Sequence, residues 1–175
     1  MEHFIEQVSP YYHGYISHVK GPDVLAFMKK SHAETISLLS GITEEQSLFA
    51  YAPGKWSIKE VLGHIIDAER IFAYRALRIA RKDKQNIPGF EQDDYVVAAH
   101  FNRTKWSDLL HQFKTLRESN LALFASFDNE AMQQEGMANN SPTNVKALIY
   151  IIAGHEKHHV NVLQEKYLKS AGMNN

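Results

Sequence analysis

The stretch "WSIKEVLGHIIDAERIFAYRALRIARK", residues 56–82, has the pattern of one long amphipathic helix. Ser57 and Glu60 form a Ser-x-x-Glu capping box, in which each side chain can bind a free backbone N–H group at the start of a helix. Beyond this box, apolar side chains return at helical spacing and share one face: Val61, Ile65, Ala68, Phe72 and Ile79. The stretch therefore predicts a helix that begins after Ser57 and buries one side.

Three further segments have the same periodicity. The first runs from Asp23 to Ser40, with Asp23 as N-cap and Gly41 as C-terminal stop. Another covers about Thr104 to Phe127, and the last runs from Pro142, which suits the first turn of a helix, to about Leu168. We expect four long helices and no β-hairpin.

The connections between these helices differ in kind. Residues 128–141 form a polar, Asn-rich link, whereas residues 83–103 are too long for a simple turn. Residues 1–22 are aromatic and irregular, and we expect them to wrap around the helices. The sequence predicts one all-α domain over residues 1–175, a four-helix bundle with a long crossover between its second and third helices.

The composition excludes several classes of protein. A net charge of −1 and the lack of a basic run argue against a nucleic-acid partner. The longest apolar run, Ala147–Ala153, is too short to span a membrane, and the first residues lack a secretion signal, so we expect a cytoplasmic protein. The chain has no cysteine and ten histidines, so any metal site must use His and carboxylate ligands.

Histidines occupy the apolar face of the last helix. In "AGHEKHHVNVL", residues 153–163, His155 and His159 are four positions apart and lie on one face. His64 lies on the second helix beside a similar apolar stripe, and a glycine precedes both His64 and His155. Three inward imidazoles on two helices can bind a divalent ion and leave its fourth position open.

The same stretch contains His-Glu-x-x-His, the zinc pattern of many metallopeptidases. Those enzymes take a third ligand from farther along the chain and use the Glu as general base. Only sixteen residues follow His159 here, and their one carboxylate, Glu165, is off the ligand face. We therefore reject a peptidase.

Two stretches carry a resemblance to a known family. "APGKWSIKEVLGHIIDAERIFAYRALRIARKDKQNIPGF" and "IIAGHEKHHVNVLQEKYL" resemble the DinB/YfiT superfamily of metal-binding four-helix bundles. The resemblance implies that His64, His155 and His159 bind one divalent ion, zinc or nickel. It also implies dimers, and enzymes that either use low-molecular-weight thiols such as bacillithiol or mycothiol or are labelled as hydrolases.

Polar residues within the apolar stripes predict what surrounds the ion. Arg75, Arg117 and Asn120 could form a substrate pocket that clamps an anionic group of a substrate or thiol. Alternatively, the arginines pair with carboxylates such as Asp67, Glu69 or Glu156. We expect Asp67, Glu156 and His158 to lie next to the ligands without binding the ion.

Three functions remain open at this stage. We favour a metal-dependent enzyme that transfers thiols to small electrophiles, and a hydrolase that activates a water molecule is the close alternative. The third is a bundle that binds metal or ligand without turnover. A second apolar strip, Leu62, Ile66, Ala73 and Leu77, is either buried or forms an oligomer interface, and we expect a homodimer.

Overall fold

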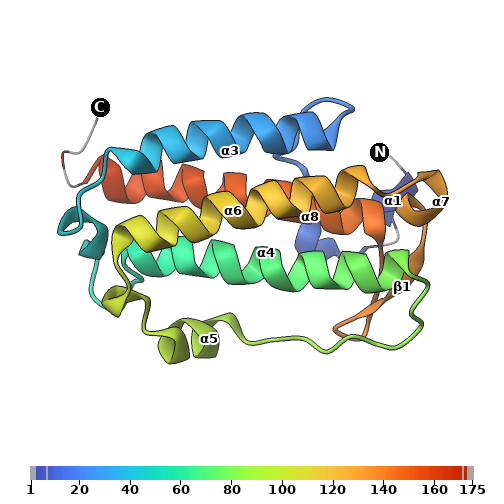
Figure 1. Ribbon diagram of the computed structural model, residues 1–175. Coiled ribbons are helices and arrows are strands. Elements are labelled where there is room, and N and C mark those ends of the chain that lie inside the picture. Colours follow the sequence, from blue (N-terminus) through green and yellow to red (C-terminus); the bar gives the residue numbers. More distant parts are fainter. Residues whose placement is uncertain (1–2, 7, 171, 173–175) are drawn as a thin grey trace.

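Four long helices make up most of the computed structural model, which describes residues 3–6, 8–170 and 172 (Figure 1). They are α3 (Val24–Ser40), α4 (Ile58–Ala80), α6 (Trp106–Ala125) and α8 (Val145–Val162), and α8 continues as the π-helical turn η4 (Leu163–Leu168). The short 3₁₀ turn η2 (Gln46–Leu48) lies between α3 and α4. The predicted four-helix bundle is confirmed.

The caps of α3 and α4 lie where the sequence predicts them. The Asp23 side chain accepts hydrogen bonds from the backbone of Leu25 and Ala26, both at 3.0 Å. Ser57 and Glu60 form the reciprocal capping box, in which the Ser57 amide donates to the Glu60 carboxylate at 2.7 Å. These side chains satisfy backbone donors that have no partner within the helix, so each helix has a defined start.

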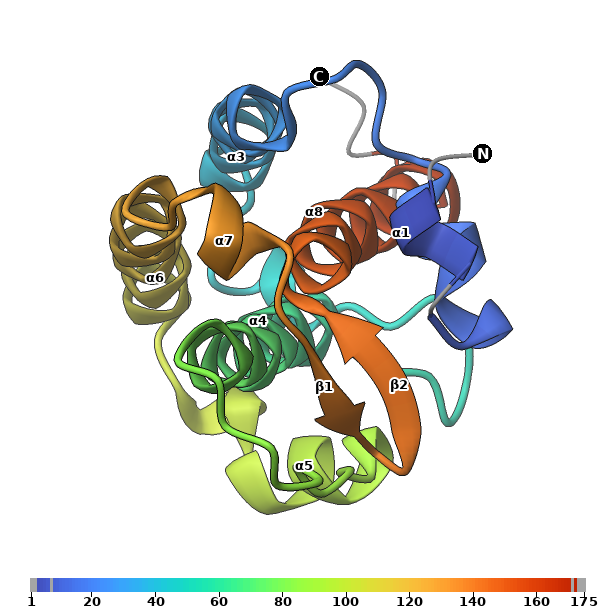
Figure 2. The ribbon, with the colours of Figure 1, turned by 90° about the vertical axis from the view of Figure 1, so that its right-hand side faces the viewer.

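The order of the helices around the bundle explains the crossover. Seen end on, α3 and α4 occupy opposite corners, and each packs against both α6 and α8 (Figure 2). The helices α4 and α6 are neighbours that run in the same direction (Figure 1). The chain must therefore return along the bundle between them, and residues 81–105 do so. This crossover includes α5 (Gln92–Ala99) and the 3₁₀ turn η3 (Phe101–Arg103).

A layer of buried polar side chains divides the core into two apolar clusters. One cluster includes Phe72, Phe124 and the first half of α8, and the other includes Trp106, Phe113 and η4. The layer between them draws on all four long helices and contains Ser31, Thr35, Glu69, Arg117, Asn120 and Glu156. Because buried polar groups are costly without partners, the polar groups of this layer must find hydrogen-bond or ionic partners within it.

Arg117 is the centre of the polar layer. Its guanidinium donates to both carboxylate oxygens of Glu69, at 2.9 and 2.8 Å, and lies 2.6 Å from the carboxylate of Glu156. Ser31 and Thr35 donate to the other oxygen of Glu156, at 3.3 and 2.7 Å. Burial alone would lower the pKa of Arg117, but the two carboxylates outweigh this effect and raise the pKa. Arg117 is therefore charged and joins α4, α6 and α8.

The link between α6 and α8 is not the irregular segment that the sequence suggested. After α7 (Asn129–Met132), β1 (Glu135–Ala138) and β2 (Ser141–Asn144) form an antiparallel hairpin. Asn139 and Asn140 make its two-residue turn with φ of 51° and 57°, left-handed values that Asn tolerates. The expectation of no hairpin was wrong because the strands are short and contain Gly136 and Pro142.

The start of α8 differs from the prediction for the same reason. Pro142 lies in β2 opposite Met137 rather than in the first turn of the helix. The helix begins at Val145, and the side chain of Asn144 accepts a hydrogen bond from the Ala147 amide at 2.8 Å. Asn144 is therefore the N-cap that the sequence analysis missed.

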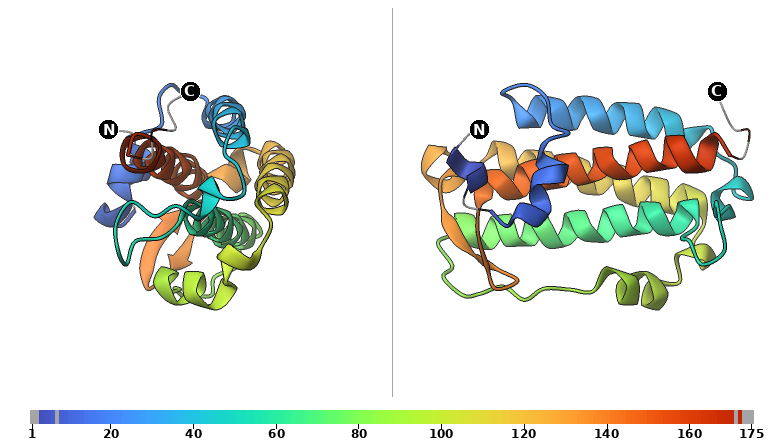
Figure 3. Two further views of the ribbon diagram at one scale, coloured as in Figure 1. Left: turned by 90° about the vertical axis from the view of Figure 1, so that its left-hand side faces the viewer. Right: turned by 180° about the vertical axis from the view of Figure 1, so that it is seen from behind.

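The N-terminal residues form short helices on one side of the bundle, beside α8, rather than the irregular segment that the sequence suggested. They form α1 (His3–Glu6), the 3₁₀ turn η1 (Pro10–Tyr12) and α2 (His13–Ile16), and α2 packs against α8 (Figure 3). A Cβ atom at Gly154 would overlap the backbone carbonyl of Tyr15. The close contact between α2 and α8 therefore requires glycine at position 154.

The second apolar strip of α4 is covered within the chain. Leu62 and Ile66 are fully buried in the cluster that contains Leu109 and Phe113 of α6. Ala73 is also buried and Leu77 is partly exposed, so the strip belongs mainly to the core, and the homodimer stays a prediction. Within the described residues, no helix is long and apolar enough to cross a membrane.

We expect Arg117→Met to lower the free energy of unfolding by roughly 3–5 kcal/mol, because it leaves the Glu69 and Glu156 carboxylates buried without a cation. Urea unfolding measures this loss. The matched control is Arg70→Met, which removes the more exposed ion pair with Asp67 and should cost at most about 1 kcal/mol. Equal losses in the two variants would contradict a central role for Arg117.

Candidate metal centre and its pocket

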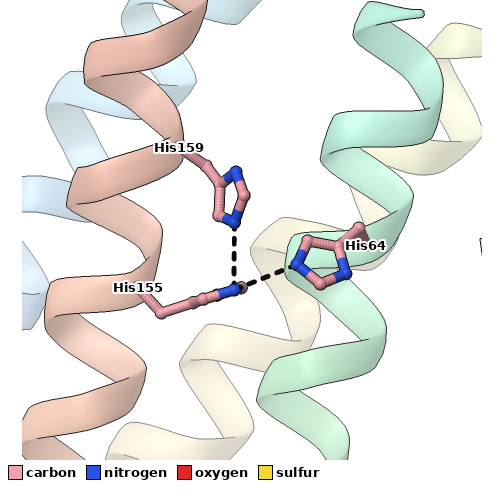
Figure 4. A group of neighbouring side chains, drawn as sticks. All are labelled: His64, His155 and His159. Carbon is pink, nitrogen blue, oxygen red and sulfur yellow. Dashed lines mark hydrogen bonds between the residues drawn. The ribbon is translucent and has the colours of Figure 1, made fainter. Parts of the chain in front are cut away.

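Three histidines converge between α4 and α8. His155 and His159 extend from one face of α8, and His64 meets them from the neighbouring α4 (Figure 4). The Nε2 atom of His155 lies 3.0 Å from that of His64 and 3.1 Å from that of His159. Among the described residues, these three are the group of His and carboxylate side chains that could hold a metal ion, with ligand atoms within 4.8 Å of one another.

The geometry and chemistry of this trio fit a divalent ion. Tetrahedral zinc with nitrogen ligands at 2.0–2.1 Å places those nitrogens about 3.3 Å apart, close to the separations seen here. Burial lowers the pKa of His64 to about 4, although Asp93 opposes this shift. Burial and the neighbouring imidazoles lower the pKa of His159 to about 3 and that of His155 well below its usual value. The imidazoles are therefore neutral at pH 7, the form that binds metals.

A cavity of about 360 Å³ opens next to the trio, and His64 and His155 both line it. Its floor continues along α4 through Ala68 and Phe72, at four-residue intervals from His64. The other walls come from the N-terminal helices, the crossover and the hairpin turn, and include Tyr11, Tyr12, Tyr15, Phe90, Glu91, Asp93 and Asn139. A small molecule in this cavity would contact the metal ligands.

The two glycines that precede His64 and His155 let other segments approach. A Cβ atom at Gly63 would overlap the ring of Phe101, which lies at the end of the crossover. Gly154 makes room for Tyr15, whose ring lies 5.2 Å from that of His155. The glycines thus admit η3 and α2 rather than bringing the two ligand helices together.

The predicted pocket arginines lie elsewhere. Arg117 and Asn120 both bind the Glu69 carboxylate in the polar layer, and neither lines the cavity. For Arg117 and Asn120, this arrangement corresponds to the alternative of a buried ion pair and replaces the proposed clamp. Periodicity located Arg117 inside the bundle but could not identify its partners on other helices. Arg75 is also buried and does not line the cavity, although it packs on Phe72, which does.

The three residues expected beside the ligands have different surroundings. Glu156 points into the polar layer and pairs with Arg117, as an inter-helix partner would. Asp67 pairs with Arg70 at 3.1 Å, away from the trio. His158 is partly buried, and its ring lies 5.2 Å from that of Tyr15 and 5.0 Å from that of His159. Of the three, His158 lies at the edge of the site.

Sequence analysis missed most of the cavity wall. The stretch "YYHGY", residues 11–15, supplies three of its tyrosines, and its aromatic content was the available signal. Phe90 and Asp93 lie in the crossover, whose length did suggest a covering segment. No local pattern indicates that these two segments meet over His64.

Comparison with known proteins agrees with this fold. The sequence profile of the DinB superfamily matches residues 28–163. The chain belongs to the DinB superfamily. A relative from Oceanobacillus iheyensis, named as a candidate metal-dependent hydrolase, is 22% identical over 143 aligned positions, and the match covers 79% of this chain and 82% of the relative. A DinB-like structure, YfiT of Bacillus subtilis, superposes with a TM-score of 0.73 at 14% identity and covers 85% of this chain and 86% of its own. Its authors describe a candidate metal-dependent hydrolase with an unusual four-helix bundle topology.

We expect the purified protein to bind about one divalent ion per chain, and His155→Ala to abolish stoichiometric binding, because His155 is the central member of the trio. Elemental analysis by mass spectrometry measures both. His158→Ala, on the same helix but outside the trio, is the control and should keep its metal. Full occupancy in His155→Ala would refute the ligand assignment.

The metal-free protein should lose stability as the pH falls from 6.5 towards 4. In that interval the unfolded chain protonates its histidines near pH 6.5, whereas His64 stays neutral in the folded state down to about pH 4. Each histidine that is protonated in the unfolded chain but neutral in the folded protein lowers the free energy of unfolding by about 1.4 kcal/mol for each pH unit of acidification. Urea unfolding in chelator at pH 7 and pH 5 measures the slope. His64→Gln should reduce this slope, whereas substitution of an exposed histidine, His111→Gln, should not. The reverse result would contradict the conclusion that buried His64 causes the pH dependence.

Proposed function

We propose that the protein is a metal-dependent hydrolase in which His64, His155 and His159 hold one zinc or nickel ion. The observation that supports this proposal is that two members of the trio line a cavity large enough for a small substrate. The names given to the two related proteins point in the same direction. A divalent ion held by three protein ligands supplies Lewis-acid activation of a water molecule or thiol at its open position.

The side chains of the cavity have separate roles in this proposal. Neutral imidazoles bind the ion without first losing a proton. The rings of Tyr12, Tyr15 and Phe72 pack against the apolar part of a substrate and exclude water from the reacting bond. The substrate is therefore a small organic molecule with a hydrolysable bond held at the His64 end of the cavity.

Asp93 is the candidate general base. Its carboxylate lines the cavity together with His64, and its charge acts on the pKa of that histidine. Glu156, which follows His155 in the sequence, is held by Arg117 and turned into the core. A carboxylate oxygen of Asp93 can accept the proton of the attacking water molecule, a role that commonly contributes 10²-fold or more to the rate.

Thiol transfer is the second candidate. The resemblance to DinB-like transferases favours it, and the chain has no cysteine, so the sulfur nucleophile would come from a low-molecular-weight thiol. The same open position and cavity would hold that thiol beside an electrophile. The two reactions differ in the nucleophile, which an experiment can identify.

The expected result is metal-dependent release of p-nitrophenol from small p-nitrophenyl esters without any thiol. Activity should be lost in chelator, return on addition of zinc or nickel, and place ¹⁸O from labelled water in the acid product. Asp93→Asn should lower kcat by about 100-fold and keep the metal, because it removes only the proton acceptor. Asp94→Asn, next to Asp93 but outside the cavity wall, is the matched control.

The other outcomes separate the remaining functions. Turnover of 1-chloro-2,4-dinitrobenzene that requires both metal and added thiol, without ester hydrolysis, would replace the hydrolase by the transferase. Metal binding without turnover of either kind would favour a binding protein. Equal rates in Asp93→Asn and Asp94→Asn would remove Asp93 from the mechanism.

A further inference from the structure

Arg75 is a buried cation without a carboxylate partner. Its side chain is 2% exposed, and one guanidinium nitrogen donates to the Pro88 carbonyl at 2.9 Å. Its Nε atom has no hydrogen-bond partner, and no carboxylate forms an ion pair with it in the described part of the chain. Arg117, equally buried, has two such partners. Since a buried charge normally has a counter-charge, Arg75 calls for an anion from outside the chain.

Arg75 lies at the end of the cavity remote from the histidines. His64, Ala68 and Phe72 form the floor along α4, and Arg75 lies one further turn along nearly the same face. With a rise of 1.5 Å per residue, its Cα atom is about 16 Å from that of His64. Its guanidinium packs 5.3 Å from the centroid of the Phe72 ring. The cation thus lies directly behind one wall of the cavity.

Tyr12 connects this cation to the cavity. Tyr12 lines the cavity, and its ring lies 5.8 Å from that of Phe72, the ring on which Arg75 packs. The positive charge of Arg75 favours the ionised form of the Tyr12 hydroxyl and opposes the rise in its pKa that burial causes. The Tyr12 hydroxyl has a proton to donate. That proton can bind an anionic oxygen in the cavity, and the positive charge of Arg75 behind the hydroxyl strengthens such a bond.

The two ends of the cavity differ in charge. The crossover runs back along α4, so that Pro88 contacts Arg75 whereas Asp93 lines the wall with His64. Glu91 and Asp93 are thus placed towards the histidines, and the guanidinium lies towards the other end. In the metal-free protein, an anion would be repelled by the carboxylates at the first end and attracted by the guanidinium at the second.

We propose that the Tyr12 hydroxyl and the Arg75 guanidinium form a subsite for an anionic group of the substrate, a carboxylate or a phosphate, at the end of the cavity remote from the metal. The substrate then has an apolar or aromatic body against the tyrosine and phenylalanine rings. Its reacting bond lies at the histidines. This proposal rests on the proposed function only in assigning the substrate to this cavity.

The test measures the affinity of matched probes for the protein as purified and again in chelator. The probes share a phenyl body and differ at the end: 3-phenylpropionate, 2-phenylethylphosphonate, 3-phenylpropanamide and 3-phenylpropylamine. We expect at least one anion to bind 10-fold or more tightly than the amide, and the amine to bind most weakly. The ratio between the two anions distinguishes carboxylate from phosphate. The preference should persist in chelator, where no metal can bind the anion.

Variants locate the subsite. Arg75→Met should reduce the affinity for the anion to that for the amide. The affinity for the amide itself, which reports an intact cavity, should stay unchanged. Arg70→Met, on the same helix but paired with Asp67 outside the cavity, should have no effect. Tyr12→Phe, which leaves Arg75 in place, should reduce the affinity for the anion at least threefold. This variant provides the test if Arg75→Met fails to fold.

Two results would overturn the subsite. One is equal affinity for anion and amide in the chelated wild-type protein, and the other is an anion preference that survives both Arg75→Met and Tyr12→Phe. Neither depends on turnover. Failure of the ester assay would therefore contradict the proposed hydrolase activity. The anion subsite would still be tested by the affinities of the probes.

Discussion

The ion cluster around Arg117 is the constraint on which the arrangement of helices depends. Two carboxylates and a guanidinium are buried between two apolar clusters, and they are tolerable there only while all three meet. Glu69 belongs to α4 and Glu156 to α8, the two helices that carry the histidines. Glu156 directly follows His155, and Glu69 is little more than one turn beyond His64. The requirement that both carboxylates reach one guanidinium therefore fixes the register in which the imidazoles meet.

This register also explains how a peptidase-like spacing serves a different purpose. In His-Glu-x-x-His peptidases, the Glu beside the first ligand acts on the substrate. Here, one step along the helix turns Glu156 by about 100°, from the ligand face towards Arg117 and α3. The acidic residues that do line the cavity, Glu91 and Asp93, come from the crossover. The helix that supplies two ligands thus also supplies a structural anchor, and the acids of the site come from a separate segment.

Sequence patterns predicted the parts of this structure that local chemistry determines. Asp23, Ser57 and Glu60 define helix starts by hydrogen bonds within a few residues, and helical periodicity brought His155 and His159 to one face. His64 could be added because its apolar stripe pointed to the same core. These signals need no knowledge of how distant segments pack.

The features that were missed depend on distant contacts or on weak local signals. Periodicity placed Arg117 inside the bundle, but its partners belong to other helices. The hairpin has short strands, and its turn of Asn139 and Asn140 resembled an ordinary polar link. The aromatic wall requires α2 to pack on α8, a contact that no spacing within residues 1–22 reveals.

The packing of Tyr15 against Gly154 has a consequence for the order of events during synthesis. These residues are 139 positions apart, so a segment that leaves the ribosome early packs on a helix that is made 139 residues later. At about 5–20 residues per second, the tyrosines of residues 11–15 spend roughly 10–30 s without the surface that covers them. Throughout that interval the nascent chain presents an aromatic segment to chaperones and to other chains. The wall of the cavity is therefore exposed to aggregation until α8 has been made.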